Sequence, residues 1–581
     1  MAISNAPEAE TPLLPDGVVS GSVDYKRRPS VRSRSGCWKS ASFIIGVEVA
    51  ERFAYYGISS NLISYFTGPL GQSTAAAAAN VNAWSGMATL LPLAGAFVAD
   101  SVLGRYRTII AASLLYVLQA HTHLQGLGLL SLSAAFHTFN SSNCKNDANN
   151  NNMSCSPPSL EVIIFFLSLY LIALAQSGHK PCVQAFGADQ FDEDDVNELK
   201  SKSSFFNWWY FSMNGGILVA ILVLSYVQDN LSWELGFGIP CIAMCFALCI
   251  FLLGTPTYRF RVNSTGKNPF VRIGWVFVKA ARNRRFEPEI KSIEEEARES
   301  TKFKFLDKAI LLPNTPDEQE HTVTLADIDD AKTILQLVPI WSACLGFAVI
   351  FSQVSTLFTK QGATMDRHII TGTTFQIPAA SLQSLISISI MLFVPIYDRI
   401  LVPTAQSLTK NPSGITMLQR IGTGVFLSFT TMVTAALVEH KRLTTAVEHG
   451  LVDKPESTVP MSVLWLAPQY LLFGLAEVFT MVGLQEFFYD QVPVDLKSIG
   501  LSLYLSIFGT GGFLSSFLIS VIEKVTGGHG DFGWFANNLN RGHLDYFYWL
   551  LSGLSALTMV GFVYFSRCYV YRRKRCSALF V

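Results

Sequence analysis

The sequence has few charged residues and no excess of either sign. Of its 581 residues only 15% are Asp, Glu, Lys or Arg, whereas soluble domains carry roughly 25%. The 43 basic residues balance the 43 acidic ones, so the overall charge favours neither nucleic acid nor an acidic substrate as a partner. With 50% hydrophobic residues and a mean hydropathy of +0.33, the chain has the composition of a membrane protein.

Catalytic motifs and a cleavable leader are also missing. The sequence contains no HExxH, Walker A or nucleophile-elbow pattern, which disfavours a hydrolase or an ATPase and predicts that the protein is not an enzyme. Cys241, Cys245 and Cys249 share one helical face, but a zinc site needs deprotonated thiols and a fourth ligand. We interpret them as packing residues and expect no metal or cofactor. Residues 1–40 are polar and precede the first apolar stretch, so no signal peptide is predicted.

Long apolar runs are abundant. A window of about 20 residues, the length that crosses a bilayer, finds two groups of six such runs. They lie near 41–66, 76–100, 108–134, 160–182, 205–226 and 234–254, and near 333–358, 376–397, 415–437, 462–484, 498–522 and 545–568. They predict an all-α membrane protein with twelve transmembrane helices. We expect a cytosolic tail over 1–40, a six-helix bundle over 41–254, a cytosolic linker over 255–330, a second bundle over 331–568 and a cytosolic tail over 569–581.

The distribution of Lys and Arg predicts the orientation. Basic residues gather in both tails and in the loop after the second segment, so both termini are expected in the cytosol. The loop between segments three and four then lies outside, where Asn140 and Asn152 are candidate glycosylation sites. Cys144 and Cys155 in the same loop are a candidate disulfide, whose geometry spacing alone does not establish.

The linker and the N-terminal tail carry three further signals. The linker stretch FVRIGWVFVKAARNRRF alternates apolar and basic residues, which is typical of an amphipathic helix on the cytoplasmic lipid surface. Ser30 follows two arginines and a proline, a pattern that a cytosolic kinase could recognise. Leu13 and Leu14 follow an acidic residue, as in a sorting signal for the vacuolar membrane; the plasma membrane is the alternative location.

Three ionisable residues interrupt the first apolar segment: Glu48, Glu51 and Arg52. Charges at membrane depth are costly, so they usually mark functional sites. A helix turns by about 100° per residue, which puts all three on one face with Tyr55. Glu48 and Arg52 have the spacing of a helical ion pair, and the second acid either shares the arginine or takes up a proton. Such a cluster suits proton coupling; an inert buried ion network is the alternative.

Each half also contains one isolated membrane charge. Lys180 lies in the fourth segment, and Glu477 lies in the tenth. A lysine and a carboxylate from opposite halves can pair in one state and separate in another, which supplies the bistable element that alternating access requires. Both residues could instead be satisfied polar groups of the core.

Four motifs resemble those of the proton-dependent oligopeptide transporters. They are ExxERFAYYG at 48–57, DSVLGRYRT at 100–108, SGHKPCVQAFGADQFD at 177–192 and FFNWWYFSMNGG at 205–216. NAWSG and FLDKA at 305–309 are similar to the plant nitrate and peptide transporter branch. The resemblance covers about 40–570 and implies the major facilitator fold, two six-helix bundles around a central site. It also implies alternating access in a proton-coupled symporter of a small anionic or zwitterionic solute, such as nitrate, a di- or tripeptide or an organic acid. A receptor that binds such a ligand without transport is the alternative.

The resemblance assigns roles to individual residues. It implies proton coupling by Glu48, Glu51, Arg52, Lys180 and Glu477, with substrate contacts from Arg52, Lys180 and Glu477 as well. Asp100 with Arg105, and Asp398 with Arg399, resemble the cytoplasmic gate motif of facilitators in the two halves.

One position departs from a nitrate carrier of the family. That carrier has a nitrate-binding histidine on its seventh helix where this chain has Phe351, and a phenyl ring cannot donate a hydrogen bond to an anion. Arg52 or Lys180 would have to supply the charge for nitrate; otherwise a larger organic anion is favoured. Candidate pocket residues are Tyr55, Tyr56, Trp341, Phe351 and Phe508, with core packing as the alternative for the aromatics. The sequence indicates no oligomeric state.

Overall fold

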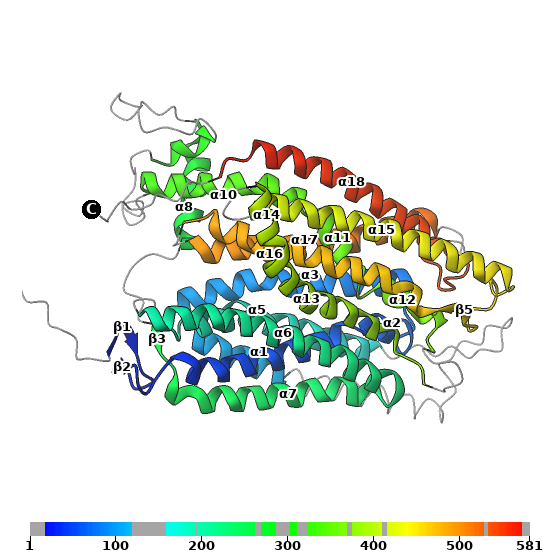
Figure 1. Cartoon of the computed structure of the whole chain (residues 1–581), viewed down its shortest axis with the longest axis horizontal. Coiled ribbons are helices and arrows are strands. Elements are labelled where there is room, and N and C mark those ends of the chain that lie inside the picture. The colour runs from blue at the N-terminus through cyan, green and yellow to red at the C-terminus, as the bar shows by residue number, and fades with distance from the viewer. Residues whose placement is uncertain are drawn as a thin grey trace, which may run out of the picture.

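The computed structural model describes ten stretches of the chain: 18–118, 159–192, 195–261, 269–285, 303–310, 323–368, 375–409, 415–493, 496–527 and 533–571. Within them, nine helices are long and apolar enough to cross a membrane. The count is ten if α10 (Leu325–Ala343) and α11 (Leu345–Phe351), which meet at a bend of 48°, are taken as one span. The long helices run roughly side by side along one axis of the molecule (Figure 1). Several predicted features lie outside the described residues: the Leu13–Leu14 signal, Asn140, Asn152, Cys144 and Cys155.

The first half of the chain forms one group of helices. They are α1 (Cys37–Ser59), α2 (Leu62–Thr67), α3 (Thr74–Val98), a helix described over 105–118, α5 (Ser159–Ala188), α6 (Val196–Asn230) and α7 (Trp233–Gly254). α1 packs against α5, α6 and α7, which bury its charged face inside this half. The charges that make α1 a poor lipid-facing helix are therefore covered by protein.

The second half forms the other group. Besides α10 and α11 it contains α12 (Leu357–Ala363), α13 (Ser384–Ile396), α14 (Val402–Thr409), α15 (Met417–Glu448), α16 (Ala467–Asp490), α17 (Lys497–Thr526) and α18 (Leu544–Cys568). α15 packs against α16 and α18. Two short parallel strands, β4 (Met365–Asp366) and β5 (Val459–Ser462), tie the loops at one end of this group. Short 3₁₀ turns cover Thr255–Thr257, Asn283–Arg285, Lys304–Ile310, Ala379–Gln383 and Val463–Leu466.

A π-helical turn stands at the same place in each half. Ala99–Leu103 continues α3, and Tyr397–Leu401 continues α13. These turns contain Asp100 in the first half and Asp398 with Arg399 in the second, the segments that resemble facilitator gate motifs. Since π turns are rare and concentrate at functional sites, their repetition supports an equivalent role for the two segments.

The halves meet closely along α3 and α17. The contact is made by glycines, because a Cβ on Gly512 would lie 2.8 Å from the Asn82 carbonyl oxygen and 2.9 Å from the Gly86 Cα. A Cβ on Gly86 would likewise lie 2.9 Å from the Gly509 carbonyl oxygen. Beside this contact the Asn82 amide donates to the Ser515 hydroxyl at 2.9 Å. Backbone from one half thus touches backbone from the other.

Further hydrogen bonds join the halves near the C-terminus of α1. The Gln383 amide donates to the Ser60 carbonyl oxygen at 2.8 Å, and the Lys360 ammonium donates to the Thr67 hydroxyl at 3.0 Å. The backbone N–H of Thr74 donates to the Asn537 side chain at 3.1 Å. We call this end the outer end, because the charge distribution predicts that it faces away from the cytosol. Here the two halves are held together.

The N-terminal tail contains an unpredicted small sheet. β1 (Val18–Val23), β2 (Pro29–Val31) and β3 (Phe260–Arg261) pair in the order β2-β1-β3, at the left of Figure 1. In the turn between β1 and β2, backbone N–H groups of Arg28 and Lys26 donate to the Asp24 carboxylate and hold its pKa below the usual range. Ser30, the predicted phosphorylation site, lies in β2 with no exposed surface. Phosphorylation would therefore require β2 to open first.

The amphipathic linker helix is present, and part of its apolar face packs against protein. α8 (Pro269–Arg282) buries Ile273, Val276 and Ala280 in the same core as Ile328 of α10. Arg272 fixes this packing through ion pairs of 3.1 Å with Asp327 and 3.0 Å with Asp330. Val271 and Val278 of the same helix remain exposed, so contact of α8 with the lipid surface stays a prediction.

Candidate functional site

The charged cluster of α1 forms as its spacing predicts. The Arg52 Nε lies 2.7 Å from the Glu48 Oε1 and 3.3 Å from the Glu51 Oε2. All three side chains are buried, with Glu51 wholly inaccessible to solvent. One guanidinium therefore holds two carboxyl groups in a place where water cannot screen them.

Tyr116 is a member of this cluster that the sequence did not indicate. It lies on the helix over 105–118, and its hydroxyl donates to the Glu51 Oε1 at 3.1 Å. The Tyr116 ring is edge-on to His179 of α5, whose Nε2 lies 2.9 Å from the Ser113 hydroxyl. A buried polar branch therefore extends from Glu51 into the first half. The presence of Ser113 and Tyr116 three residues apart in an apolar segment was the available sequence signal.

Some polar atoms of this cluster have no hydrogen-bond partner among the described residues. They are one oxygen each of Glu48 and Glu51, the Nδ1 of His179, and both side-chain polar atoms of Gln176. Buried polar atoms without partners are uncommon and are concentrated where chemistry requires them. Of the two carboxyl oxygens, the Glu51 Oε2 still lies within ion-pair distance of the Arg52 Nε, at 3.3 Å.

Lys180 belongs to the α1 cluster. It lies on α5 and is close enough to Arg52, Glu51 and Glu48 to interact electrostatically with all three. Its side chain is only partly buried, unlike the three residues of α1. Lys180 therefore places a cation between the buried cluster and accessible space.

Glu477 provides the charge of the second half. It lies on α16 and is partly accessible, and Tyr56, Tyr210 and Tyr504 are within electrostatic reach of its carboxylate. Tyr56 is also within reach of Arg52, so this one phenol is near the charges of both halves. Within the described stretches, Lys180 and Glu477 form no ion pair with each other or with another residue. The anticipated pairing is therefore not present in this state.

The predicted aromatic residues divide into two groups. Tyr55 stacks on Trp84 at a centroid distance of 5.5 Å, and the Trp84 indole donates to the Leu169 carbonyl oxygen at 2.8 Å. Tyr55 thus packs beside the cluster, and a role in substrate contact stays a prediction. On the side of Glu477, Phe351 packs against Phe508 at 5.3 Å.

The second group of aromatic side chains forms a wall. Phe508 also contacts Tyr504 at a centroid distance of 5.6 Å, and the Trp341 indole donates to Ser506 on the same helix at 2.8 Å. Trp341 and Phe351 of this wall remain partly accessible. This wall lies in the half opposite the charged cluster, so a ligand between the halves would meet cations and carboxyls on one side and rings with one carboxyl on the other.

One of the predicted gate charges, Arg105, has a partner among the described residues. Arg105 pairs with Asp189 at the end of α5 at 2.5 Å, and Arg261 of β3 lies 3.6 Å from the same carboxylate. Arg105 thus links the start of the helix over 105–118 to the end of α5, a pairing that the motif did not predict. The side chains of Asp100 and Asp398 lie outside the described part of the structure, while Arg399 is exposed in its π turn.

The end of the molecule opposite the outer end contains a second buried arginine. Arg259 has almost no exposed surface and pairs with Glu198 through bonds of 2.7 and 3.1 Å. Its guanidinium also donates to the carbonyl oxygens of Ser35 at 2.7 Å and Gln190 at 3.1 Å. Since Ser35, Gln190 and Glu198 come from three segments, this arginine fastens the N-terminal sheet to the ends of α5 and α6.

Comparison with known proteins identifies the relatives of this architecture. A model described as the POT family matches residues 106–535. Protein NRT1/PTR FAMILY 5.10 of Arabidopsis thaliana is 59% identical over 580 residues, which cover 99% of both chains. Protein NRT1/PTR FAMILY 5.14 of the same plant is 55% identical, covering 96% of this chain and 98% of its own.

Solved structures share the fold. An auto-inhibited POT family peptide transporter has a TM-score of 0.66 at 21% identity, covering 93% of this chain and 99% of its own. A POT family transporter in complex with 5-aminolevulinic acid has a TM-score of 0.62 at 15% identity, covering 91% of this chain and 96% of its own. The predicted class, an all-α membrane protein with the major facilitator fold, is confirmed.

Proposed function

Since the chain belongs to the POT family and is a multi-pass membrane transporter, we propose that it is a proton-coupled symporter of a small anionic or zwitterionic solute that works by alternating access. The observation that carries the proposal is the buried triad in which Arg52 contacts Glu48 at 2.7 Å and Glu51 at 3.3 Å. Two carboxyl groups that share one cation are poised for one of them to gain and lose a proton. No nucleotide is needed.

The proton supplies the energy. A proton that moves through about 100 mV releases about 2.3 kcal/mol, and each pH unit adds about 1.4 kcal/mol. One proton per solute could therefore sustain a concentration ratio between roughly tenfold and thousandfold, because each 1.4 kcal/mol corresponds to a factor of ten.

The arrangement of charges favours a solute with a negative group. Lys180 and Arg52 present cations from the first half, and Glu477 with the aromatic wall faces them from the second half. A zwitterion could place its carboxylate near Lys180 and its amine near Glu477. Solved relatives are described in complexes with 5-aminolevulinic acid and with a conjugated peptide, which are solutes of this kind. Phe351 makes the second half a better surface for an organic group than for a bare inorganic anion.

The conformational cycle would use the contacts between the halves. The hydrogen bonds at the outer end hold this state closed there, and transport requires them to break while the gate segments around Asp100 and Asp398 close the opposite end. Lys180 and Glu477 are unpaired here among the described residues, and they could pair in another state. Such a pair would make the conformational cycle of the empty carrier differ from that of the solute-loaded carrier.

The test is solute accumulation in proteoliposomes that contain only this protein. Labelled nitrate, a dipeptide and an organic acid are offered with and without an inward proton gradient. Accumulation of one of them above its external concentration, abolished by a protonophore, is the expected result. A receptor that binds without transport, the alternative function, would instead show saturable binding of one solute with no flux in either condition.

A further inference from the structure

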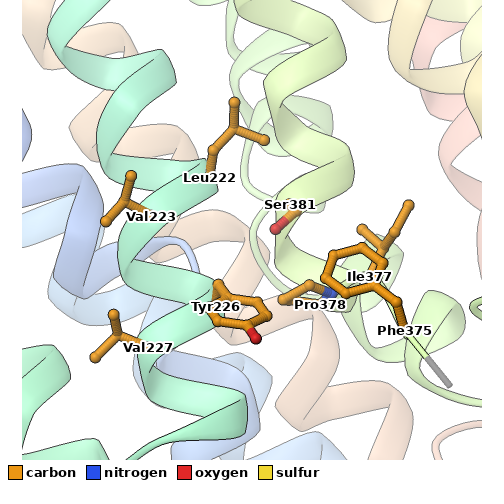
Figure 2. Close-up of a pocket in the computed structure, with 8 residues that line it drawn as sticks. All are labelled: Leu222, Val223, Tyr226, Val227, Phe375, Ile377, Pro378 and Ser381. Atoms are coloured by element: carbon orange, nitrogen blue, oxygen red, sulfur yellow. The ribbon is translucent and has the colours of Figure 1, made fainter.

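An apolar groove opens on the outer surface of the bundle, between the two halves and near the outer end. It has a volume of about 560 Å³, within the range of small-molecule sites. Figure 2 shows its two walls: α6 on one side, and the segment that leads into α13 on the other. The lining residues are Leu222, Val223, Tyr226, Val227, Phe375, Ile377, Pro378 and Ser381.

The groove lies where lipid surrounds the protein. Its α6 wall is part of the span Ser204–Asn230, and its other wall leads into the span Ala379–Leu408. Leu222, Val223, Tyr226 and Phe375 each expose between 39% and 54% of their surface, so the groove is open sideways. Leu222 is eight residues from the end of α6, and at about 1.5 Å per residue the groove extends about 12 Å below that end. This depth is that of the acyl region in the outer leaflet.

The rim of the groove contains the polar groups that a phospholipid head requires. Arg367 lies 3.9 Å from the Asp229 carboxylate, two residues beyond Val227, and donates to Gln376 at 3.1 Å, between Phe375 and Ile377. A pair at 3.9 Å is long for an ion pair, and 27% of the Arg367 side chain is exposed. Guanidinium groups bind phosphate through two parallel hydrogen bonds.

We propose that this groove binds one acyl chain of an outer-leaflet phospholipid whose phosphate contacts Arg367. One wall belongs to the first half and the other to the second, and Tyr226 stacks on Phe375 across the join at 6.0 Å. In the alternating-access cycle of the proposed function, on which this step rests, the halves separate at the outer end and the groove is lost. The lipid is therefore a ligand of the outer-closed state and, by linkage, stabilises that state.

The test uses the full-length wild-type protein in nanodiscs with a small fraction of phosphatidylcholine that carries a photoreactive group midway along one acyl chain. Peptides from 222–227 and 375–381 should be labelled at least fivefold more than the exposed surface of α18 around Leu557 and Val560, which samples ordinary surrounding lipid. Excess unlabelled phosphatidylcholine should saturate the groove label first. Equal labelling at the two places would overturn the proposal, as would displacement by a sterol but not by phospholipid.

A matched pair of variants checks the mapping. Val223→Trp fills the groove, whereas Val219→Trp makes the same change one turn away on the exposed side of α6. Labelling of 222–227 should fall at least fivefold in V223W and stay unchanged in V219W. If V223W instead converts a dimer to a monomer, the groove binds a second copy of the chain and the proposal fails. The labelling pattern of the wild-type protein does not depend on any variant, so the proposal is still tested if V223W misfolds. Lipid labelling does not depend on transport, so it can fail or succeed separately from the proposed symport.

Discussion

Replacement of Gly512 by alanine should open the outer end of the transporter. A Cβ at this position would lie 2.8 Å from the Asn82 carbonyl oxygen, 2.9 Å from the Gly86 Cα and 3.0 Å from the Gly86 nitrogen. All three are backbone atoms of α3, so no side chain can rotate away. The clash exists only while α3 and α17 are in contact. In the proposed alternating-access cycle these helices separate at this point when the outer end opens, so the clash would penalise the outer-closed state.

The size of the effect follows from the geometry. Insertion of a methyl group into a close-packed interface costs typically 1–3 kcal/mol, because the neighbouring backbone has to shift. Alanine also favours the helix by roughly 0.5–1 kcal/mol over glycine, but that gain is the same in both states and cancels. The ratio of outer-open to outer-closed molecules should therefore rise by about 5-fold to 150-fold.

Spin-label distance measurements provide the assay. Labels at Ala76 on α3 and at Lys454 in the loop after α15 are both exposed and belong to different halves. In Gly512→Ala the distance distribution should gain a longer component. Gly238→Ala is the matched control, because a Cβ on Gly238 meets nothing within 4 Å. If the distributions of G512A and wild type coincide, the glycine contact does not control the outer end and the reasoning is refuted.

Two further substitutions test the buried clusters. Tyr116→Phe removes the hydroxyl that donates to Glu51 at 3.1 Å. Loss of a bond to a charged group costs about 1.5–3 kcal/mol, which favours the protonated carboxyl over the carboxylate. The pH of half-maximal solute uptake should therefore rise by about one unit or more. An unchanged pH profile would show that Tyr116 only fills space. In the second buried cluster, Arg442 donates to the Glu439 carboxylate at 2.7 and 2.8 Å. Arg442→Met leaves that carboxylate buried without a counterion and should lower the free energy of unfolding in detergent by about 3–5 kcal/mol. Adding Glu439→Gln should recover part of that loss, and a change below 1 kcal/mol in the single variant would contradict the account.

The spacing of charges in α1 predicted its local geometry well. Glu48 and Arg52 are four residues apart on one helix, so their pairing depends only on helical geometry and on burial. The alternation of apolar and polar stretches also predicted the long helices. Contacts within one element, or forced by the membrane, are those that a single sequence can reveal.

Contacts between distant segments could not be predicted in the same way. Tyr116 and Glu51 are 65 residues apart in the sequence, and Arg259 and Glu198 are 61 apart. Nothing in the sequence around Tyr116 or Arg259 indicates which residue each one contacts. The small sheet was missed because β3 has two residues and forms only beside β1. The packing of α8 on α10 was not predicted either, because an apolar face is compatible with either lipid or protein as its partner.

The proton role of the triad is tested most directly by Glu51→Gln in proteoliposomes. Glutamine keeps the size and polarity of the side chain but cannot carry the proton. With the solute that the wild type accumulates, we expect E51Q to lose accumulation driven by an inward proton gradient while retaining part of the exchange of labelled for unlabelled solute. Glu234→Gln, on the exposed first turn of α7, should keep both activities. Undiminished proton-driven accumulation in E51Q would contradict the assignment of Glu51 as the coupling group.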